Sequence, residues 1–322
     1  MRGRGIGRYI VRRLLLLVPI VLLISIAVFL LTSLIPGGAV AALLNGRATS
    51  VEQIAQLRAK FGLDKPLVTQ YSNWLSGLFH GDLGRSFRTS QLVSRSIKER
   101  FSLTLILHGI GLVLAVLIGV PLGTWAAMRR GTARDRGVVG LSIFGSSSPS
   151  FVVALVFLWV FAQKLDWFPL FGAGDGSFTD KLYHLLLPGV VMAVAPMGLV
   201  MKITRASMLD QISQDHISFA RARGLSERRV IIVYGLRNAL IPVLTAAGLL
   251  FVGLLTGTVF VETVFGLPGL GSLLISAVRT SDIPVIQGLA LIVGIWIVLA
   301  NLLVDLAYAL VDPRVDFQKV GK

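Results

Sequence analysis

Long uncharged runs, separated by short charged segments, make up most of the chain. Six runs reach the roughly 20 residues that an α-helix needs to cross a bilayer. They cover residues 14–35, 101–128, 137–163, 182–201, 239–261 and 283–304. The runs lack the alternation of a membrane β-barrel strand, so the pattern predicts an all-α polytopic membrane protein with six transmembrane helices.

Proline and serine residues affect three of these predicted helices. Pro121 lies in the second run, and Pro188 and Pro196 lie in the fourth. The third run contains Ser-Ser-Ser-Pro-Ser at 146–150, which is typical of a polar break in a helix. We therefore expect less regular helices at these places but the same burial.

The first run could instead be a cleavable signal peptide. Arg12 and Arg13 precede it, and residues 39–41 loosely resemble a cleavage site. The hydrophobic part of a signal peptide has about 7–15 residues, however, and this run is clearly longer. Its length favours retention as a membrane anchor.

The distribution of basic residues indicates the orientation of the helices. With the N-terminus in the cytoplasm, 19 of the 31 Lys and Arg residues fall on the inner side. Of the 12 on the outer side, nine lie in loop 36–100, which is long enough to escape the positive-inside rule. Both termini are therefore predicted in the cytoplasm, although Arg95, Lys98 and Arg100 lie close to the second helix on the outer side.

These assignments divide the chain into four parts. They are a cytoplasmic N-terminus with the first helix (1–35), an extracytoplasmic loop (36–100), a core of five helices (101–313) and a cytoplasmic tail (314–322). In the outer loop, the capping-box pair Ser50 and Gln53 predicts one helix ending at Gly62. The apolar spacing over 67–79 predicts a second, ending near Gly81. Both helices could lie at the membrane interface or contact a soluble partner.

The inner loop 202–238, within the core, contains two predicted short helices. Asp215 is a candidate N-cap for the first helix, and Gly224 is expected at its C′ position. Ser226 is a candidate N-cap for the second helix. We expect that helix to reach Asn238, before Pro242 at the start of the fifth transmembrane helix.

Two roles are open for this basic loop. Its helices could lie on anionic lipid, which attracts Lys and Arg. Alternatively, the first helix is a docking surface for a partner, and its movement is transmitted to the transmembrane helices on either side. In that case two small residues permit close approach and four arginines meet an acidic groove: Ala220 and Ala222, with Arg221, Arg223, Arg228 and Arg229.

Composition agrees with a membrane protein and excludes several kinds of chemistry. Hydrophobic residues make up 54% of the chain and charged residues 15%, which nearly excludes a soluble enzyme. A net charge of +15 fits either nucleic acid or an anionic membrane, and the placement of the charges favours the membrane. Cysteine and a phosphate-binding loop are absent, and the four histidines lack ligand spacing. We therefore expect no catalytic residues, no metal site and no nucleic-acid partner.

Few polar residues lie within the predicted helices. His108 and Asn301 are candidates to line a translocation pathway, because polar side chains in a membrane usually face a bundle interior or an aqueous path. Interhelical hydrogen bonds are the alternative for both residues. The motifs Gly119-x-x-x-Gly123 and Gly253-x-x-x-Gly257 predict close helix packing.

The loop from Asp215 to Pro242 resembles the coupling segment of binding-protein-dependent ABC importer permeases, in the form of the dipeptide/oligopeptide/nickel branch. It reads Ala-Arg-Ala-Arg-Gly-Leu-Ser over 220–226 and Leu-Arg-Asn-Ala-Leu-Ile-Pro over 236–242. The general family motif begins Glu-Ala-Ala, whereas this chain has Ser-Phe-Ala over 218–220, and Arg223 replaces the usual Lys. Further segments are similar to this branch in order and spacing: 62–66, 70–71, 81–86, 261–271, 282–284 and 305–314. Residues 36–38 differ, with Pro-Gly-Gly where the branch has Pro-Gly-Asp.

The resemblance implies a type I importer fold, in which a first helix lies outside a core of five. It also implies three kinds of partner: a second homologous permease subunit, two cytoplasmic ATPase subunits that bind ATP and Mg²⁺, and an extracytoplasmic substrate-binding protein. The chain itself would hold no cofactor. On this basis six residues are assigned to ATPase docking: Phe219, Ala220, Arg221, Ala222, Arg223 and Gly224.

The implied function is ATP-driven import of peptides across the cytoplasmic membrane by alternating access. The same machinery could carry nickel chelates or another small solute. A stand-alone secondary transporter or channel is the competing class. The scarcity of intramembrane acidic residues and the absence of a visible inverted repeat argue against it.

Overall fold

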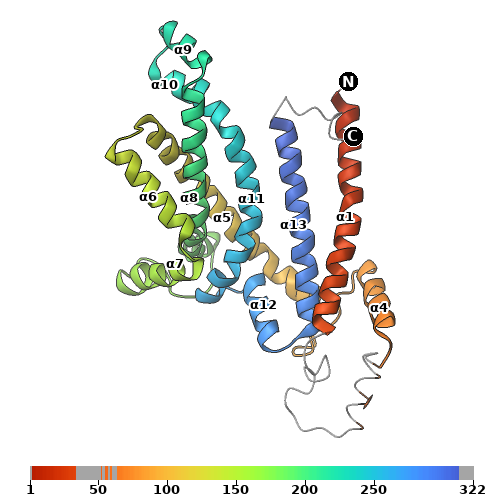
Figure 1. Cartoon of the computed structure of the whole chain (residues 1–322). Helices are drawn as coiled ribbons and strands as arrows, with labels where there is room; N and C mark the ends of the chain where they lie inside the picture. Colours follow the sequence, from red (N-terminus) through yellow and green to blue (C-terminus); the bar gives the residue numbers. More distant parts are fainter. Residues whose placement is uncertain (1, 34–51, 53–54, 57–58, 60–63, 312–322) are drawn as a thin grey trace. The chain divides into compact units, whose positions relative to one another are not determined.

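The computed structural model of the chain describes residues 2–33 and 64–311, together with residues 52, 55, 56 and 59 (Figure 1). Within this part the chain is helical and contains no named β-strand, which confirms the all-α class. In chain order the helices are α1 (Arg2–Ser33), α4 (Leu67–Phe79), α5 (Val93–Met128), α6 (Ala133–Ser147), α7 (Ser150–Phe157), the π-helix η1 (Leu158–Lys164), α8 (Phe178–Ile212), α9 (Asp215–Ala222), α10 (Glu227–Arg229), the π-helix η2 (Val230–Leu236), α11 (Arg237–Val264), α12 (Leu270–Arg279) and α13 (Ile283–Val311).

The third predicted transmembrane helix is broken. Five helices are long and apolar enough to cross a membrane, and the sixth candidate is the pair α6 and α7–η1, which bends by 105°. The bend lies at Ser148 and Pro149, whose ψ angles of 125° and 132° are extended. Proline has no N–H to continue the helix and disfavours the helical conformation of the residue before it. The prediction of one span over 137–163 is therefore wrong in form, whereas the predicted polar break is confirmed.

Prolines have a different effect in the fourth transmembrane helix. α8 continues for 35 residues through Pro188 and Pro196, both of which are buried. The irregularity expected there does not interrupt the helix.

The chain forms two compact units. Unit 1 contains the described residues up to Ser102 together with Gly269–Leu299, and unit 2 contains Leu103–Pro268 and the described residues from Ala300 onward.

In unit 1, α4 has the predicted bounds and contacts α1. The Ser25 and Tyr71 hydroxyls lie 2.8 Å apart, and the Phe29 ring lies against those of Tyr71 and Trp74. In the same unit, the Asp282 carboxylate accepts hydrogen bonds from the Ser86 hydroxyl and the Phe87 N–H. The predicted helix over 50–61 and the tail 314–322 fall largely or wholly outside the described residues.

In unit 2, α8 is held by very close contacts with α5. A Cβ added to Gly119 would lie 2.8 Å from a Val200 methyl, and one added to Gly123 would lie 2.6 Å from the Met201 carbonyl oxygen. Close packing at the first glycine motif is therefore confirmed. At the second motif, a Cβ on Gly253 would meet nothing within 4 Å, so that glycine makes no close contact among the described residues.

Candidate functional site

The predicted first helix of the inner loop is present as α9, at one end of unit 2 (Figure 1). Its N-cap is Gln214, without a side-chain capping bond, so the prediction that Asp215 caps the helix is wrong by one position. Asp215 lies instead in the first turn, where an acidic side chain is favourable beside the positive end of the helix dipole.

The C-terminal end of α9 follows the prediction. Gly224 has a φ of +75°, which a residue with a side chain rarely adopts. The Gly224 N–H donates to the Arg221 carbonyl at 2.9 Å, and the Leu225 N–H donates to the Ala220 carbonyl at 3.4 Å. These two bonds define a Schellman motif, with Gly224 at the predicted C′ position.

The two faces of α9 differ. Ile217 and Ala220 are buried against Val230, and Phe219 is 70% exposed. Arg221, Ala222 and Arg223 are exposed as well. Ala220 therefore packs inside the loop and does not lie on its exposed face, and its assignment to ATPase docking stays a prediction.

The second predicted helix of the inner loop does not exist as a separate element. Ser226 is the N-cap of α10, but its side chain makes no capping bond; its carbonyl accepts from the Arg229 and Val230 N–H groups. α10 then continues through η2 into α11, and together they form one candidate membrane span beginning at Glu227. Pro242 lies inside α11 and not at its start.

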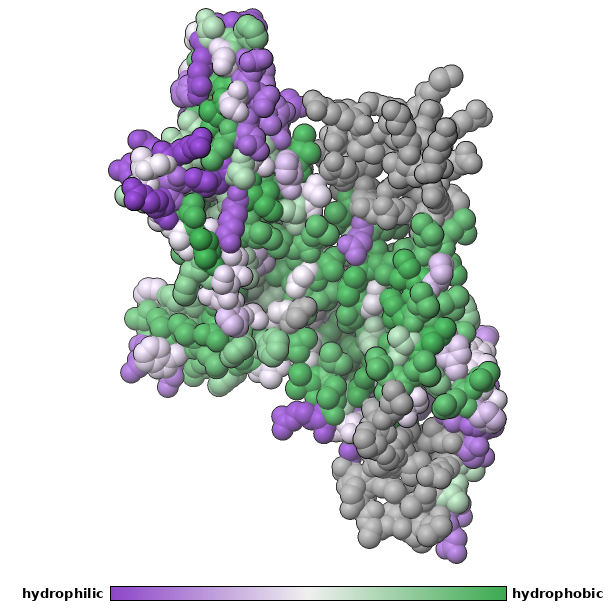
Figure 2. Space-filling view, in the orientation of Figure 1, coloured by the Kyte–Doolittle hydropathy of each residue, from purple (hydrophilic) through white to green (hydrophobic). Residues whose placement is uncertain are grey.

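The exposed surface of this loop is basic. Figure 2 shows hydrophilic residues gathered over α9 and α10, and hydrophobic residues over the helices of unit 2 that support them. Arg221 donates two hydrogen bonds to Glu227, at 3.2 and 2.7 Å, and this pairing raises the pKa of Arg221. Arg223, Arg228 and Arg229 are also exposed, so the surface is suited to an acidic partner.

Two routes connect α9 with the transmembrane helices. Only Ser213 and Gln214 separate it from α8. The cluster of Ile217, Ala220 and Val230 joins it to η2, where a Cβ on Gly235 would lie 3.3 Å from the Met208 methyl of α8. α9 is therefore connected to both α8 and α11 by chain continuity and by packing.

The structure places the two pathway candidates differently. His108 is 1% exposed and its ring bonds to the Thr104 carbonyl at 2.7 Å and the Thr258 hydroxyl at 3.1 Å. This is the interhelical hydrogen bonding that the sequence left open as an alternative. Asn301 is half-buried on α13. A role for either residue in translocation stays a prediction.

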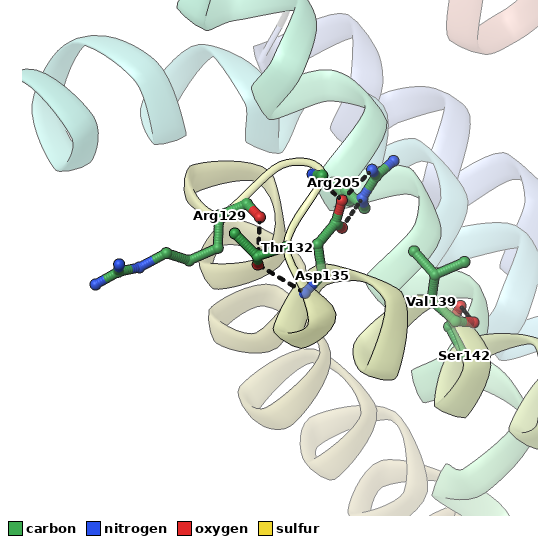
Figure 3. Close-up of polar contacts among 7 residues, drawn as sticks. Arg129, Thr132, Asp135, Val139, Ser142 and Arg205 are labelled. Carbon is green, nitrogen blue, oxygen red and sulfur yellow. Dashed lines mark hydrogen bonds and ion pairs between the residues drawn. The ribbon is translucent and has the colours of Figure 1, made fainter.

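An ion pair that the sequence analysis missed joins α6 to α8. Arg205 donates to the two carboxylate oxygens of Asp135 at 2.6 and 2.8 Å (Figure 3). Thr132 and Asp135 have the Thr-x-x-Asp spacing of a helix start, which is the signal that could have drawn attention to Asp135. No spacing in the sequence indicates its partner on a distant helix.

Comparison with known proteins identifies the family. The model described as the binding-protein-dependent transport system inner membrane component matches residues 119–317, and the model of the N-terminal part of such membrane components matches residues 6–108. The chain belongs to this family.

Similar proteins include named transport permeases. The dipeptide transport system permease protein DppB of Escherichia coli (strain K12) is 37% identical over 337 residues, covering 97% of this chain and 99% of that protein. A Brucella suis protein, provisionally named a peptide transport system permease, is 40% identical over 312 residues, covering 96% and 98%.

A solved structure supports the permease fold. The chain is similar to one chain of the MetNI methionine ABC transporter in an inward-facing conformation, with a TM-score of 0.56 and 17% identity. The match covers 67% of this chain and 96% of that chain. The predicted type I importer fold is thereby confirmed.

Proposed function

We propose that this chain is the permease subunit of an ATP-driven importer that carries peptides across the cytoplasmic membrane. The observation that carries the proposal is the near full-length similarity to DppB, whose name specifies dipeptide transport. Membership in a binding-protein-dependent family supports delivery of the substrate by a separate extracytoplasmic protein.

In the proposed assembly, this chain pairs with a second, homologous permease subunit. Two cytoplasmic ATPase subunits bind ATP and Mg²⁺ and supply the energy, and both termini of the chain lie in the cytoplasm. The basic, exposed face of α9 supports docking of an acidic ATPase groove, with Phe219 as its apolar contact.

ATP-driven closure of the ATPases moves α9, and α9 moves α8 and α11. The helices then alternate between inward-open and outward-open arrangements. The short link at 213–214 and the buried cluster around Ile217 and Val230 support this step, because neither leaves α9 free to move alone.

The test is reconstitution of the chain in vesicles with its partner permease, ATPases and binding protein. We expect ATP-dependent uptake of a labelled dipeptide. Gly224→Val should uncouple ATP hydrolysis from uptake, because a β-branched residue at φ +75° is strained and disturbs the end of α9.

Gly172→Val is the matched control, since Gly172 has a φ of +89° and a Cβ there meets nothing within 4 Å. Uptake by the chain without ATPases would overturn the proposal in favour of a stand-alone transporter. Uptake of a nickel chelate in place of the dipeptide would support the ATP-driven importer but contradict the peptide substrate.

A further inference from the structure

Asp135 and Arg205 form a nearly enclosed ion pair at one end of unit 2. Their side chains are 4% and 26% exposed, respectively. In the surface pairs Arg95–Glu99 and Arg221–Glu227, by contrast, every side chain is at least 41% exposed. A two-point bond between a guanidinium and a carboxylate, shielded from water, fixes the relative position of its partners far better than a surface pair does.

The carboxylate of Asp135 is also bonded to its own turn. The Gly131 N–H donates to Oδ2 at 3.0 Å, and the Asp135 N–H donates to the Thr132 hydroxyl oxygen at 3.4 Å. The Thr132 hydroxyl in turn donates to the Arg129 carbonyl at 2.6 Å (Figure 3). Arg205 therefore holds the whole turn between α5 and α6, and not a single side chain.

The position of Arg205 on α8 is close to α9. Arg205 lies seven positions, about 10 Å of helix, before Ile212 at the end of α8, and two more residues lead to α9. A displacement of α9 therefore reaches the level of Arg205 early along α8.

Farther along α8, backbone atoms of α8 and α6 approach each other directly, without side chains between them. A Cβ on Gly198 would lie 2.5 Å from the Ser142 carbonyl oxygen, and one on Gly145 would lie 3.0 Å from the Val194 carbonyl oxygen. Lys202 adds a bond of 2.8 Å to the Ser146 hydroxyl. The C-terminal part of α6 thus touches the middle of α8 directly, and the ion pair joins the two helices nearer to α9.

We propose that Asp135 and Arg205 are a positioning pair that makes α6 follow α8 when α9 moves, so that the two helices are displaced as one body. This inference rests on the proposed function, since it assigns the pair a part in transmitting the movement of the ATPases.

The first test is Asp135→Asn in the reconstituted complex, with peptide uptake and ATP hydrolysis measured together. Asparagine keeps the shape of the side chain and an acceptor for Gly131 but removes the charge that holds Arg205. We expect uptake per ATP hydrolysed to fall about tenfold, a size typical of coupling between distant sites, while hydrolysis continues.

Arg136→Gln is the control, because Arg136 is exposed on the same turn and its substitution changes the net charge by one unit, in the opposite direction, without touching the ion pair. An unchanged ratio of uptake to hydrolysis in Asp135→Asn would overturn the inference. The same holds if the variant lowers only the amount of assembled complex, which is the effect of a purely structural role.

The second test uses the absence of cysteine from the chain. In the double variant Asp135→Cys and Arg205→Cys, a short bifunctional methanethiosulfonate reagent can replace the ion pair with a reversible covalent link. We expect the link to restore the ratio of uptake to hydrolysis, and a reductant to remove it again. If linking α6 to α8 instead stops uptake, the helices must separate during transport and the inference fails.

Different results would contradict the proposed function and the role of the ion pair. Absence of ATP-dependent uptake by the unmodified complex contradicts the proposed function. Uncoupling by Gly224→Val without uncoupling by Asp135→Asn contradicts only the role of the ion pair.

Discussion

At the scale of single residues, glycines determine how closely the helices of unit 2 approach one another. The added Cβ of Gly198→Ala would meet the Ser142 carbonyl oxygen at 2.5 Å and the Ser146 backbone nitrogen at 2.9 Å. Backbone atoms cannot move aside as a flexible side chain can, so we expect a loss of about 1–3 kcal/mol in stability. The measurement is thermal unfolding of the purified protein in detergent.

Gly253→Ala provides the comparison for that experiment. Its Cβ meets nothing within 4 Å, and alanine is the better helix former, so its melting temperature should stay equal to or above that of the unmodified chain. Equal melting temperatures for the two variants would show that the contact between α6 and α8 tolerates a side chain.

The hydrogen bond between Thr258 and His108 gives a second prediction at this scale. Thr258→Val keeps the shape of the side chain but leaves the His108 Nε2, now paired at 3.1 Å, without that partner in a buried site. We expect a loss of about 1 kcal/mol, as is usual for hydrogen bonds between membrane helices. Thr263→Val, at an exposed position of the same helix, should change the melting temperature less.

At the scale of elements, α9 separates a structural face from a docking face. Ile217→Ala removes buried methyl groups and should lower stability by about 2 kcal/mol, the lower end of the range for such changes. Phe219→Ala, at a position 70% exposed, should leave the melting temperature unchanged but weaken retention of the ATPases during purification. The opposite pattern, in which Phe219→Ala unfolds the loop and retains the ATPases, would contradict the docking role.

Local sequence signals predicted the elements that depend on local chemistry. Gly224 marked the end of α9 because the left-handed backbone conformation at that position favours a residue without a side chain. The apolar spacing over 67–79 predicted the bounds of α4. Local signals could not predict that α10, η2 and α11 form one continuous span. Ser226 has the composition of a cap, but whether a helix stops or continues into the next depends on packing against α9 and α8.

Contacts between distant helices were likewise beyond the reach of sequence patterns. Gly253 and Gly257 have the same spacing as Gly119 and Gly123. Among the described residues, however, only Gly119 and Gly123 lie in very close contact with a neighbouring helix. Arg205 appeared as one basic residue among seven in the inner loop, and its pairing with Asp135 requires the fold itself.

At the scale of the whole molecule, the distribution of charge along the chain predicts its orientation in the membrane. Single cysteines test this directly, because the chain has none of its own. A membrane-impermeant maleimide applied to intact cells should label Asp175→Cys, an exposed position between η1 and α8, and should label Ser213→Cys only after the membrane is permeabilised. The reverse labelling would contradict cytoplasmic termini.

The bend at Pro149 has a consequence for the surrounding bilayer. α6 has 15 residues and a length of about 22 Å, whereas the hydrocarbon layer of a typical membrane is about 30 Å thick. A helix too short for its membrane is accommodated by local thinning of the lipid, at an energetic cost for each ångström of mismatch. We therefore expect the thickness of the host membrane to act on this permease at α6, where lipids with shorter acyl chains match the length of the helix better than lipids with longer ones.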